Sequence, residues 1–219
     1  MYVPPHFAVD DPALVRAAIE ANPLATLVTC GPAGLMANHV PLLYVCMGAA
    51  SEGQTLGTLH GHLARANPQW REIQSGTDVL AIFSGPDAYI SPSAYETKRE
   101  TGKVVPTWNY VVVHLYGSGQ TYDDPERLHE LVTELTNVHE RIREERWAVT
   151  DAPEAFIAGQ LRGIVGIEIA VTRSIGKWKL SQNRSVADRR GVTADLTASP
   201  VSRERATAEV MSELQGSPD

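Results

Sequence analysis

The amino-acid sequence predicts an α+β fold, mainly β, in which an antiparallel barrel carries peripheral helices and a helical C-terminal tail. Three observations predict it. About six stretches have the alternation or the apolar character of strands. Helical patterns lie between these stretches without the regular alternation that produces a parallel sheet. After Val186 the chain holds only helical patterns and no further strand.

The N-terminal third begins with a short helix and continues into a β-hairpin. Asp10 or Asp11 followed by Pro12 is typical of a helix start, and Asn22 with Pro23 ends that helix. The segments LATLVTC and LMANHVPLLYV flank the turn sequence GPAG, so they predict two strands of a hairpin. Pro41 has no backbone N–H to donate, which places it at a sheet edge or a bulge.

The middle of the chain predicts three strands and a helix. TLGTLHGHL is the first of these strands, and Asn67 then caps a short helix, PQWREIQS. A buried strand covers 78–84 and continues through 86–90, and a long loop follows over 91–106. The run from Thr107 to Tyr122 predicts a long strand with Trp108 on one face and Asn109 on the other.

The last third predicts two helices, a strand and the tail. Asp124 and Pro125 begin a helix that extends to about Trp147, and a second helix covers 153–161. A strand over 163–175 ends or bends at Gly176. Two helical patterns between 186 and 214 are broken at Ser199 and Pro200. We therefore predict one domain over residues 1–198 and a helical tail over 199–219.

Composition narrows the range of functions. Of the 219 residues, 43% are hydrophobic and 21% are charged, which is the ordinary mixture of a soluble globular protein. The net charge of −7 argues against a broad basic surface for nucleic acid. The sequence predicts neither a signal peptide nor a membrane span. With only two cysteines, Cys30 and Cys46, interpreted as buried thiols, we expect a cytoplasmic protein.

The segment GHLARANP, from Gly61 to Pro68, could bind a phosphate. A strand end, a glycine and a helix start meet there, with His62 and Arg65 available for charge-assisted hydrogen bonds. The plainer alternative is that Asn67 only caps the helix while the two basic side chains are solvated. The pattern does not decide between these two interpretations.

Three histidines, His39, His60 and His62, could suggest a metal site. No cysteine or carboxylate lies at ligand spacing beside them, so we favour histidines that form hydrogen bonds in a pocket and predict no metal.

Two further segments, VPTWNY and KWKLSQN, combine a tryptophan with amide or cationic side chains. A flavin needs an aromatic or apolar surface for its ring and polar groups for its edge and phosphate. Trp108 could face the ring, and Lys177 or Lys179 could meet its anionic groups. Its edge could be served by Asn109, Gln182 and Asn183. A tryptophan packed in the core is the alternative. Arg184, with the neighbouring arginines at 189 and 190, forms a basic stretch that could contact phosphate or nucleic acid.

Taken together and in this order, MYVPPHF, NHVPL, GHLARANPQW, YISPSAYETK, VPTWNY and KWKLSQNRS resemble the PaiB family of FMN-binding negative transcriptional regulators. The resemblance implies a split β-barrel of the pyridoxamine-phosphate-oxidase-like kind. It also implies a homodimer with flavin mononucleotide (FMN) near the subunit interface. The phosphate positions of that superfamily fall in this sequence on the following residues: Asn38, His39, Gly61, His62 and Arg65.

The function expected from the resemblance is a regulator that acts through flavin or another small ligand. A flavin-dependent oxidoreductase is the alternative, although no catalytic residue can be assigned. A haem-binding protein is a further possibility, with His39, His60 and His62 as candidate ligands. Direct DNA contact has weak support, because no basic recognition helix is visible in the sequence. On this interpretation, Arg65→Ala weakens FMN binding.

Overall fold

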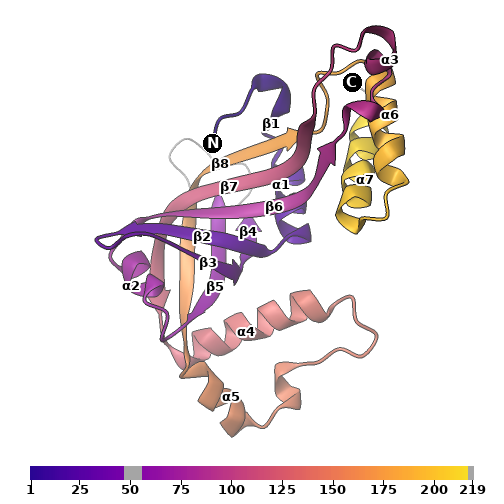
Figure 1. Cartoon of the computed structure of the whole chain (residues 1–219). Coiled ribbons are helices and arrows are strands. Elements are labelled where there is room, and N and C mark those ends of the chain that lie inside the picture. The colour runs from indigo at the N-terminus through magenta and orange to yellow at the C-terminus, as the bar shows by residue number, and fades with distance from the viewer. Residues whose placement is uncertain (47–55, 217–219) are drawn as a thin grey trace. The chain divides into compact units, whose positions relative to one another are not determined.

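The computed structural model describes residues 1–46 and 56–216. Its strands form one eight-stranded sheet with the path β3-β2-β6-β7-β8-β5-β4 and with β1 paired to β8 (Figure 1). The registered pairs are antiparallel. The strands are β1 (Ala8–Val9), β2 (Leu24–Gly31), β3 (Gly34–Pro41), β4 (Leu43–Cys46), β5 (Gly57–Ala64), β6 (Asp78–Ile90), β7 (Thr107–Tyr122) and β8 (Ile164–Lys179).

The α-helices are α1 (Pro12–Ala21), α2 (Gln69–Gln74), α3 (Glu96–Thr101), α4 (Pro125–Glu140), α5 (Glu154–Leu161), α6 (Val186–Thr197) and α7 (Ser202–Gly216). Short 3₁₀ turns lie at η1 (Pro5–Phe7), η2 (Pro92–Ala94) and η3 (Val149–Asp151). Among the described residues no helix is both long and apolar enough to cross a membrane. The predicted α+β fold with an antiparallel sheet, peripheral helices and a helical tail is confirmed.

The chain divides into two compact units, and the strands β6, β7 and β8 contribute to both. The first unit, called the terminal unit here, comprises residues 1–21, 84–113 and 175–219. The second, called the central unit, comprises residues 22–83 and 114–174.

The core of the central unit follows from the two-residue period of its strands. Leu59 and Leu63 on β5 are buried, and so are Ile167 and Ile169 on β8. Because side chains alternate across a strand, the polar residues between them on β5, including His62, lie on the opposite, half-buried face.

The terminal unit has its own core around α6 and α7, which lie against each other (Figure 1). Val192 and Leu196 on α6 and Met211 on α7 are almost completely buried. Trp178, on the last part of β8, is also buried. The helical tail therefore contributes buried side chains to the core of the terminal unit.

Local signals placed most of the elements correctly. The Asp124 side chain caps α4 by accepting a hydrogen bond of 2.9 Å from the backbone N–H of Arg127. The hairpin turn is closed by the pair Gly31 and Gly34. Pro41 ends β3, which is at one end of the sheet path, as its missing N–H requires.

Three boundaries were predicted wrongly. α4 ends at Glu140 and not near Trp147, because the charged run that follows has no apolar stripe to bury, and Ile142 within it is 81% exposed. The predicted loop 91–106 contains η2 and α3. β8 continues through Gly176, where a β-carbon would stand 2.5 Å from the Val9 carbonyl oxygen, so this glycine admits the neighbouring strand β1 instead of ending β8.

The cysteine prediction was wrong for Cys30. Its side chain is exposed, because the alternation of β2 puts it on the face opposite to the buried Leu27 and Thr29. The side chain of Cys46, like the predicted loop GAASEGQ that follows it, lies outside the described residues.

Candidate functional site

The strand-to-helix corner of the central unit begins where β5 ends at Ala64. The Asn67 side chain accepts a 3.0 Å hydrogen bond from the backbone N–H of Gln69, so it caps α2, which begins one residue later than expected. The indole N–H of Trp70 donates to the Arg65 carbonyl at 3.0 Å. The corner is therefore closed by its own hydrogen bonds.

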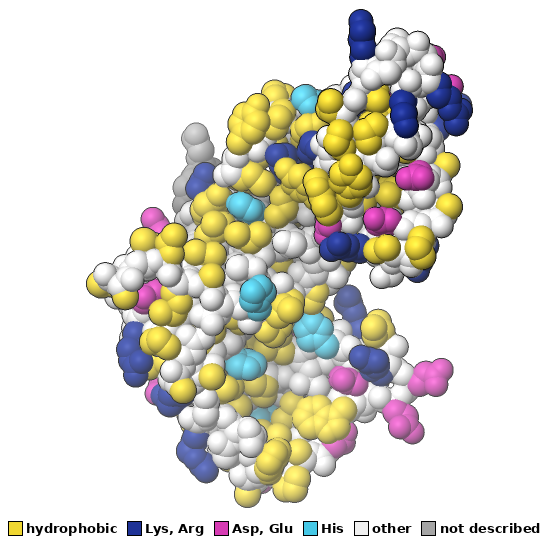
Figure 2. Space-filling model, in the orientation of Figure 1, with side chains coloured by type: hydrophobic (Ala, Val, Ile, Leu, Met, Phe, Trp, Pro, Cys, Tyr) yellow, Lys and Arg dark blue, Asp and Glu magenta, His cyan; other side chains and the backbone are white. Residues whose placement is uncertain are grey.

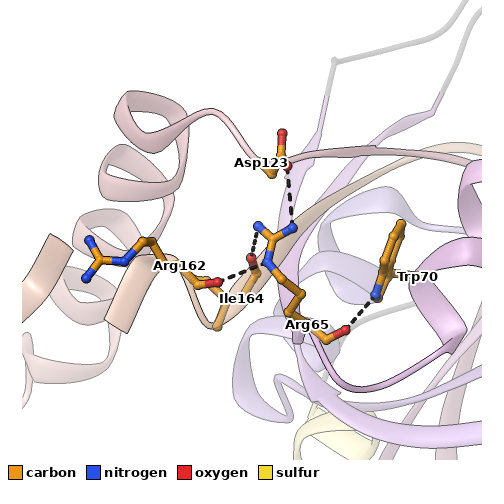
Figure 3. Close-up of polar contacts among 5 residues, drawn as sticks. All are labelled: Arg65, Trp70, Asp123, Arg162 and Ile164. Atoms are coloured by element: carbon orange, nitrogen blue, oxygen red, sulfur yellow. Dashed lines mark hydrogen bonds and ion pairs between the residues drawn. The ribbon is translucent and has the colours of Figure 1, made fainter. Parts of the chain in front are cut away.

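The Arg65 guanidinium points back into the fold (Figure 3). Its Nε donates to the carbonyl of Arg162 at 2.9 Å, and one terminal nitrogen donates to the carbonyl of Ile164 at 3.0 Å. The other terminal nitrogen pairs with the Asp123 carboxylate at 3.4 Å. Arg65 thus ties the end of β5 to the start of β8 and to the segment before α4. We call this arrangement the Arg65 clamp.

The three histidines take different positions in the central unit. His39 is exposed on β3, whereas His60 and His62 lie two residues apart on β5 and share its half-buried face. The Nδ1 atom of His62 is buried and has no hydrogen-bond partner. Burial lowers the pKa of His62, so its ring is neutral at pH 7 and offers a hydrogen bond but no positive charge.

Two other predicted phosphate residues have roles within the fold. The Asn38 amide donates to the side chain of Gln69 at 2.9 Å, and buried Gln69 in turn donates to the Leu27 carbonyl. A β-carbon at Gly61 would stand 2.5 Å from Leu42 Cδ2, so this glycine is required by packing against Leu42. Close approach of a ligand is not needed to explain either residue.

The second group of predicted site residues lies in the terminal unit, on the last part of β8. Lys179 donates to the Thr107 hydroxyl and to the Trp108 carbonyl. Lys177 is 8% exposed and donates to the Tyr2 carbonyl at 3.1 Å. Neither lysine forms an ion pair with a carboxylate in the part of the chain that the structure describes. We call Lys177, Lys179 and Arg184 the basic cluster.

The charges that act on Lys179 are both positive, whereas Arg184 also interacts with the Asp188 carboxylate. Burial lowers the pKa of Lys179, and the positive charges of Lys177 and Arg184 lower it further. Arg184 lies over the ring of Tyr95, with its guanidinium carbon 4.9 Å from the ring centroid. An anion bound here would reduce the repulsion among the three cations.

A small cavity of about 50 Å³ adjoins this cluster, and its walls include Lys179, Arg184, Thr107 and Asn183. Ligand pockets are typically about 300–1,000 Å³, so this cavity has room for one small polar group and not for a flavin ring. Two cations beside hydroxyl and amide groups suit an anionic oxygen group.

The other two predicted site residues of the terminal unit, Trp108 and Gln182, differ in whether their side chains are free to contact a ligand. The Trp108 side chain is 48% exposed and forms an edge-on pair with half-exposed Tyr89, their ring centroids 6.0 Å apart. The Gln182 side chain instead forms hydrogen bonds with nearby backbone groups. It donates to the Trp178 carbonyl at 2.6 Å and accepts from the Leu180 N–H at 2.7 Å. Trp108 can therefore contact a ligand, whereas the Gln182 amide shapes the turn after β8.

Sequence reasoning missed the pair that holds this turn. Ser181 has a φ of 64°, which is unusual for a residue other than glycine. Its hydroxyl exchanges hydrogen bonds with the fully buried Asn109 amide at 3.0 and 3.2 Å. A serine carries no sequence signal for a left-handed backbone, so only the structure identifies this pair.

With this geometry in view, the chain can be compared with known proteins. Residues 1–173 match a family model described as "Putative FMN-binding domain". The chain is 33% identical to the protease synthase and sporulation protein PAI 2 of Bacillus subtilis over 98% of this chain and 96% of that protein. It is also 31% identical to an uncharacterized protein of Emericella nidulans over 82% of this chain and 83% of that protein.

Solved structures show likeness of fold at low sequence identity. The flavocytochrome Anf3 of Azotobacter vinelandii matches with a TM-score of 0.56 and 15% identity over 78% of this chain and 69% of that one. An FAD and heme binding protein of Mycobacterium smegmatis matches with a TM-score of 0.55 and 13% identity over 83% of this chain and 77% of that one.

The fold and the family model define the class, which is the FMN-binding split barrel. The chain belongs to the PaiB family of FMN-binding domain proteins, so the resemblance read from the sequence is confirmed. Its cofactor is FMN. The residues of the terminal unit fit this group, because Lys177 and Lys179 form no ion pair with a carboxylate in the described part of the chain and Lys179 adjoins a small polar cavity.

Proposed function

We propose that this chain is an FMN-binding regulator of the PaiB type, that it works as a homodimer, and that Lys179 holds the FMN phosphate. The observation that carries the phosphate assignment is the basic cluster beside a small polar cavity. Lys179 keeps its ammonium group on two neutral oxygens, and its pKa is lowered by burial and by Lys177 and Arg184. A phosphate would supply the missing negative charge.

The exposed Trp108 and Tyr89 side chains support a ring contact in the same unit. Aromatic pairs of this kind offer an apolar surface on which a planar ring can stack. FMN, when bound, supplies hydride or one-electron chemistry, while the protein supplies binding and orientation. The predicted contacts of His39, His60 and His62 with the cofactor stay predictions.

The regulatory part of the proposal rests on the resemblance to the PaiB family and on likeness to the Bacillus subtilis protein, whose name refers to protease synthase and sporulation. Direct reading of DNA has little support. On the face seen in Figure 2, basic and acidic side chains are interspersed. α7 carries two arginines, Arg203 and Arg205, against three glutamates, whereas DNA-recognition helices are basic. We therefore place the regulatory output on the flavin or on a small ligand.

The homodimer rests on the family resemblance. Light scattering coupled to size exclusion measures the mass of the particle directly, and we expect twice the 23.8 kDa of one chain. A monomer at micromolar concentration would remove this part of the proposal and leave the phosphate assignment standing.

The decisive experiment for the cofactor site is an FMN titration of the purified protein, preceded by its absorption spectrum. We expect flavin bands and saturable binding that weakens in Lys179→Ala. Haem bands, or no flavin binding after reconstitution, would contradict the proposal. If anaerobic reduction by a nicotinamide cofactor is followed by turnover of a small molecule, the oxidoreductase alternative replaces the regulator.

A further inference from the structure

A hollow in the central unit is lined by none of the terminal-unit residues proposed to bind FMN. α4, η3 and α5 border a cavity of about 680 Å³, within the range of small-molecule pockets. Val149 and Leu161, both buried, and half-buried Ile157 give it an apolar lining. A second cavity of about 500 Å³ shares Pro125, Ala158 and Leu161 with the first. Together they form a groove between α4 and α5, which lie beside each other in Figure 1.

The ionisable residues that line the larger cavity are three glutamates and one histidine, His129. Glu126, Glu130 and Glu154 line it and are exposed, and neither a lysine nor an arginine is among its lining residues. None of the three carboxylates forms an ion pair with another described residue. Three unpaired carboxylates around an apolar floor complement a molecule with a cationic head and an apolar body.

We propose that the groove between α4 and α5 binds an organic cation, specifically an amine with an apolar body. The ammonium group meets the glutamates of the rim, and the body covers Val149, Ile157 and Leu161. The area of apolar surface removed from water contributes most of the affinity, and the carboxylates select the charge.

The groove also has a physical connection to the sheet. Its second cavity is lined by Arg65, Asp123 and Arg162, and these residues form the Arg65 clamp at the end of β5. An occupant that moves α4 or α5 therefore acts on the clamp. The role of the amine as the ligand to which the regulator responds rests on the proposed function, whereas its binding does not.

The test uses three probes of the same shape that differ in the head group: 4-phenylbutylamine, 4-phenylbutyrate and 4-phenylbutanol. Titration calorimetry on the full chain reconstituted with FMN measures each affinity. We expect the amine to bind at least tenfold more tightly than the carboxylate, with the alcohol between them. Equal affinities for amine and carboxylate, or no binding of the amine, would overturn the proposal.

Substitutions test separately how much the glutamates of the rim and the apolar lining contribute to binding. Glu126→Gln and Glu130→Gln should each weaken amine binding several-fold and leave the alcohol unchanged. Glu134→Gln, on the same helix but not among the lining residues, is the matched control. Ala158→Leu fills both cavities from an exposed helical position and should weaken both amine and alcohol.

FMN titration of each variant distinguishes this proposal from the proposed function. We expect Ala158→Leu to keep its FMN affinity, which also shows that it folds. If Ala158→Leu instead changes the mass of the particle in light scattering, the groove is an interface between copies, and the amine site is rejected. If a basic peptide competes while the small amine does not bind, the site belongs to a protein partner, and the proposal also fails.

Discussion

Arg65 in the central unit and Lys179 in the terminal unit were predicted for the same task, and their surroundings differ. The Arg65 guanidinium donates hydrogen bonds to two backbone carbonyls and pairs with the Asp123 carboxylate. Lys179 donates only to neutral oxygens, and the charged side chains that lower its pKa, Lys177 and Arg184, are cations. The positive charge of Arg65 is paired with a carboxylate within the fold, whereas that of Lys179 has no carboxylate partner among the described residues and is available to a ligand.

The position of a basic residue next to a helix start does not by itself say whether its charge is free to meet a phosphate. The charge has to be left without a carboxylate and close to an open space. Lys179 meets both conditions, whereas Arg65 lines a cavity but pairs with the Asp123 carboxylate and so fails the first condition. Four substitutions test this contrast.

Lys179→Ala should have the largest effect. Removing a charge-assisted hydrogen bond costs about 1.5–3 kcal/mol, so FMN affinity should fall roughly 10- to 100-fold in a fluorescence titration. Lys103→Ala removes the same charge from an exposed position of the terminal unit and should leave the affinity unchanged. An unaltered affinity in Lys179→Ala would remove this lysine from the phosphate site.

Arg65→Ala should act on stability instead of affinity. It leaves two backbone carbonyls without their donor, and we expect a loss of about 2 kcal/mol in the free energy of unfolding, measured by urea titration. Arg162→Ala is the matched control, because only the carbonyl of Arg162 takes part in the clamp. A large loss of FMN affinity without loss of stability would restore Arg65 to the cofactor site.

Gly61→Ala tests whether this glycine serves packing or a ligand. The new methyl group would meet buried Leu42, and relief of that contact should cost about 1 kcal/mol of stability, at the lower end of overpacking costs. Gly159→Ala, with no atom closer than 3.8 Å to the added carbon, should not destabilise the protein. Loss of FMN binding at unchanged stability would show that a ligand approaches Gly61.

The smallest effect concerns pH and His62. Burial holds its folded pKa below the ordinary 6.5, so the unfolded chain binds more protons and stability falls as the pH drops through 6.5. His62→Gln should therefore lose less stability than the parent between pH 7 and pH 5.5 in urea titrations. Burial also lowers the pKa of His114, which retains part of the dependence. Exposed His139→Gln is the control, and a parent-like pH profile in His62→Gln would contradict the assignment.

The sequence could predict the features that depend on residues close together in the chain. Asp124 and Pro125 identify the start of α4, and strand alternation identifies the buried face of β5, because both depend on residues a few positions apart. It could not predict the side-chain partners of Arg65 or the pairing of Asn109 with Ser181, which join residues 58 to 99 positions apart. The surroundings of the candidate site residues depend on such distant partners, so the sequence could name these residues but not the contacts that each of them makes.

The Arg65 clamp has a consequence for the order of folding. Its two carbonyl acceptors come 97 and 99 residues after Arg65 in the chain. During synthesis the arginine leaves the ribosome long before them, so the corner at the end of β5 cannot be completed until β8 has emerged. Contacts of such long sequence separation slow folding, and a nascent chain stopped before β8 would still expose this end of its sheet.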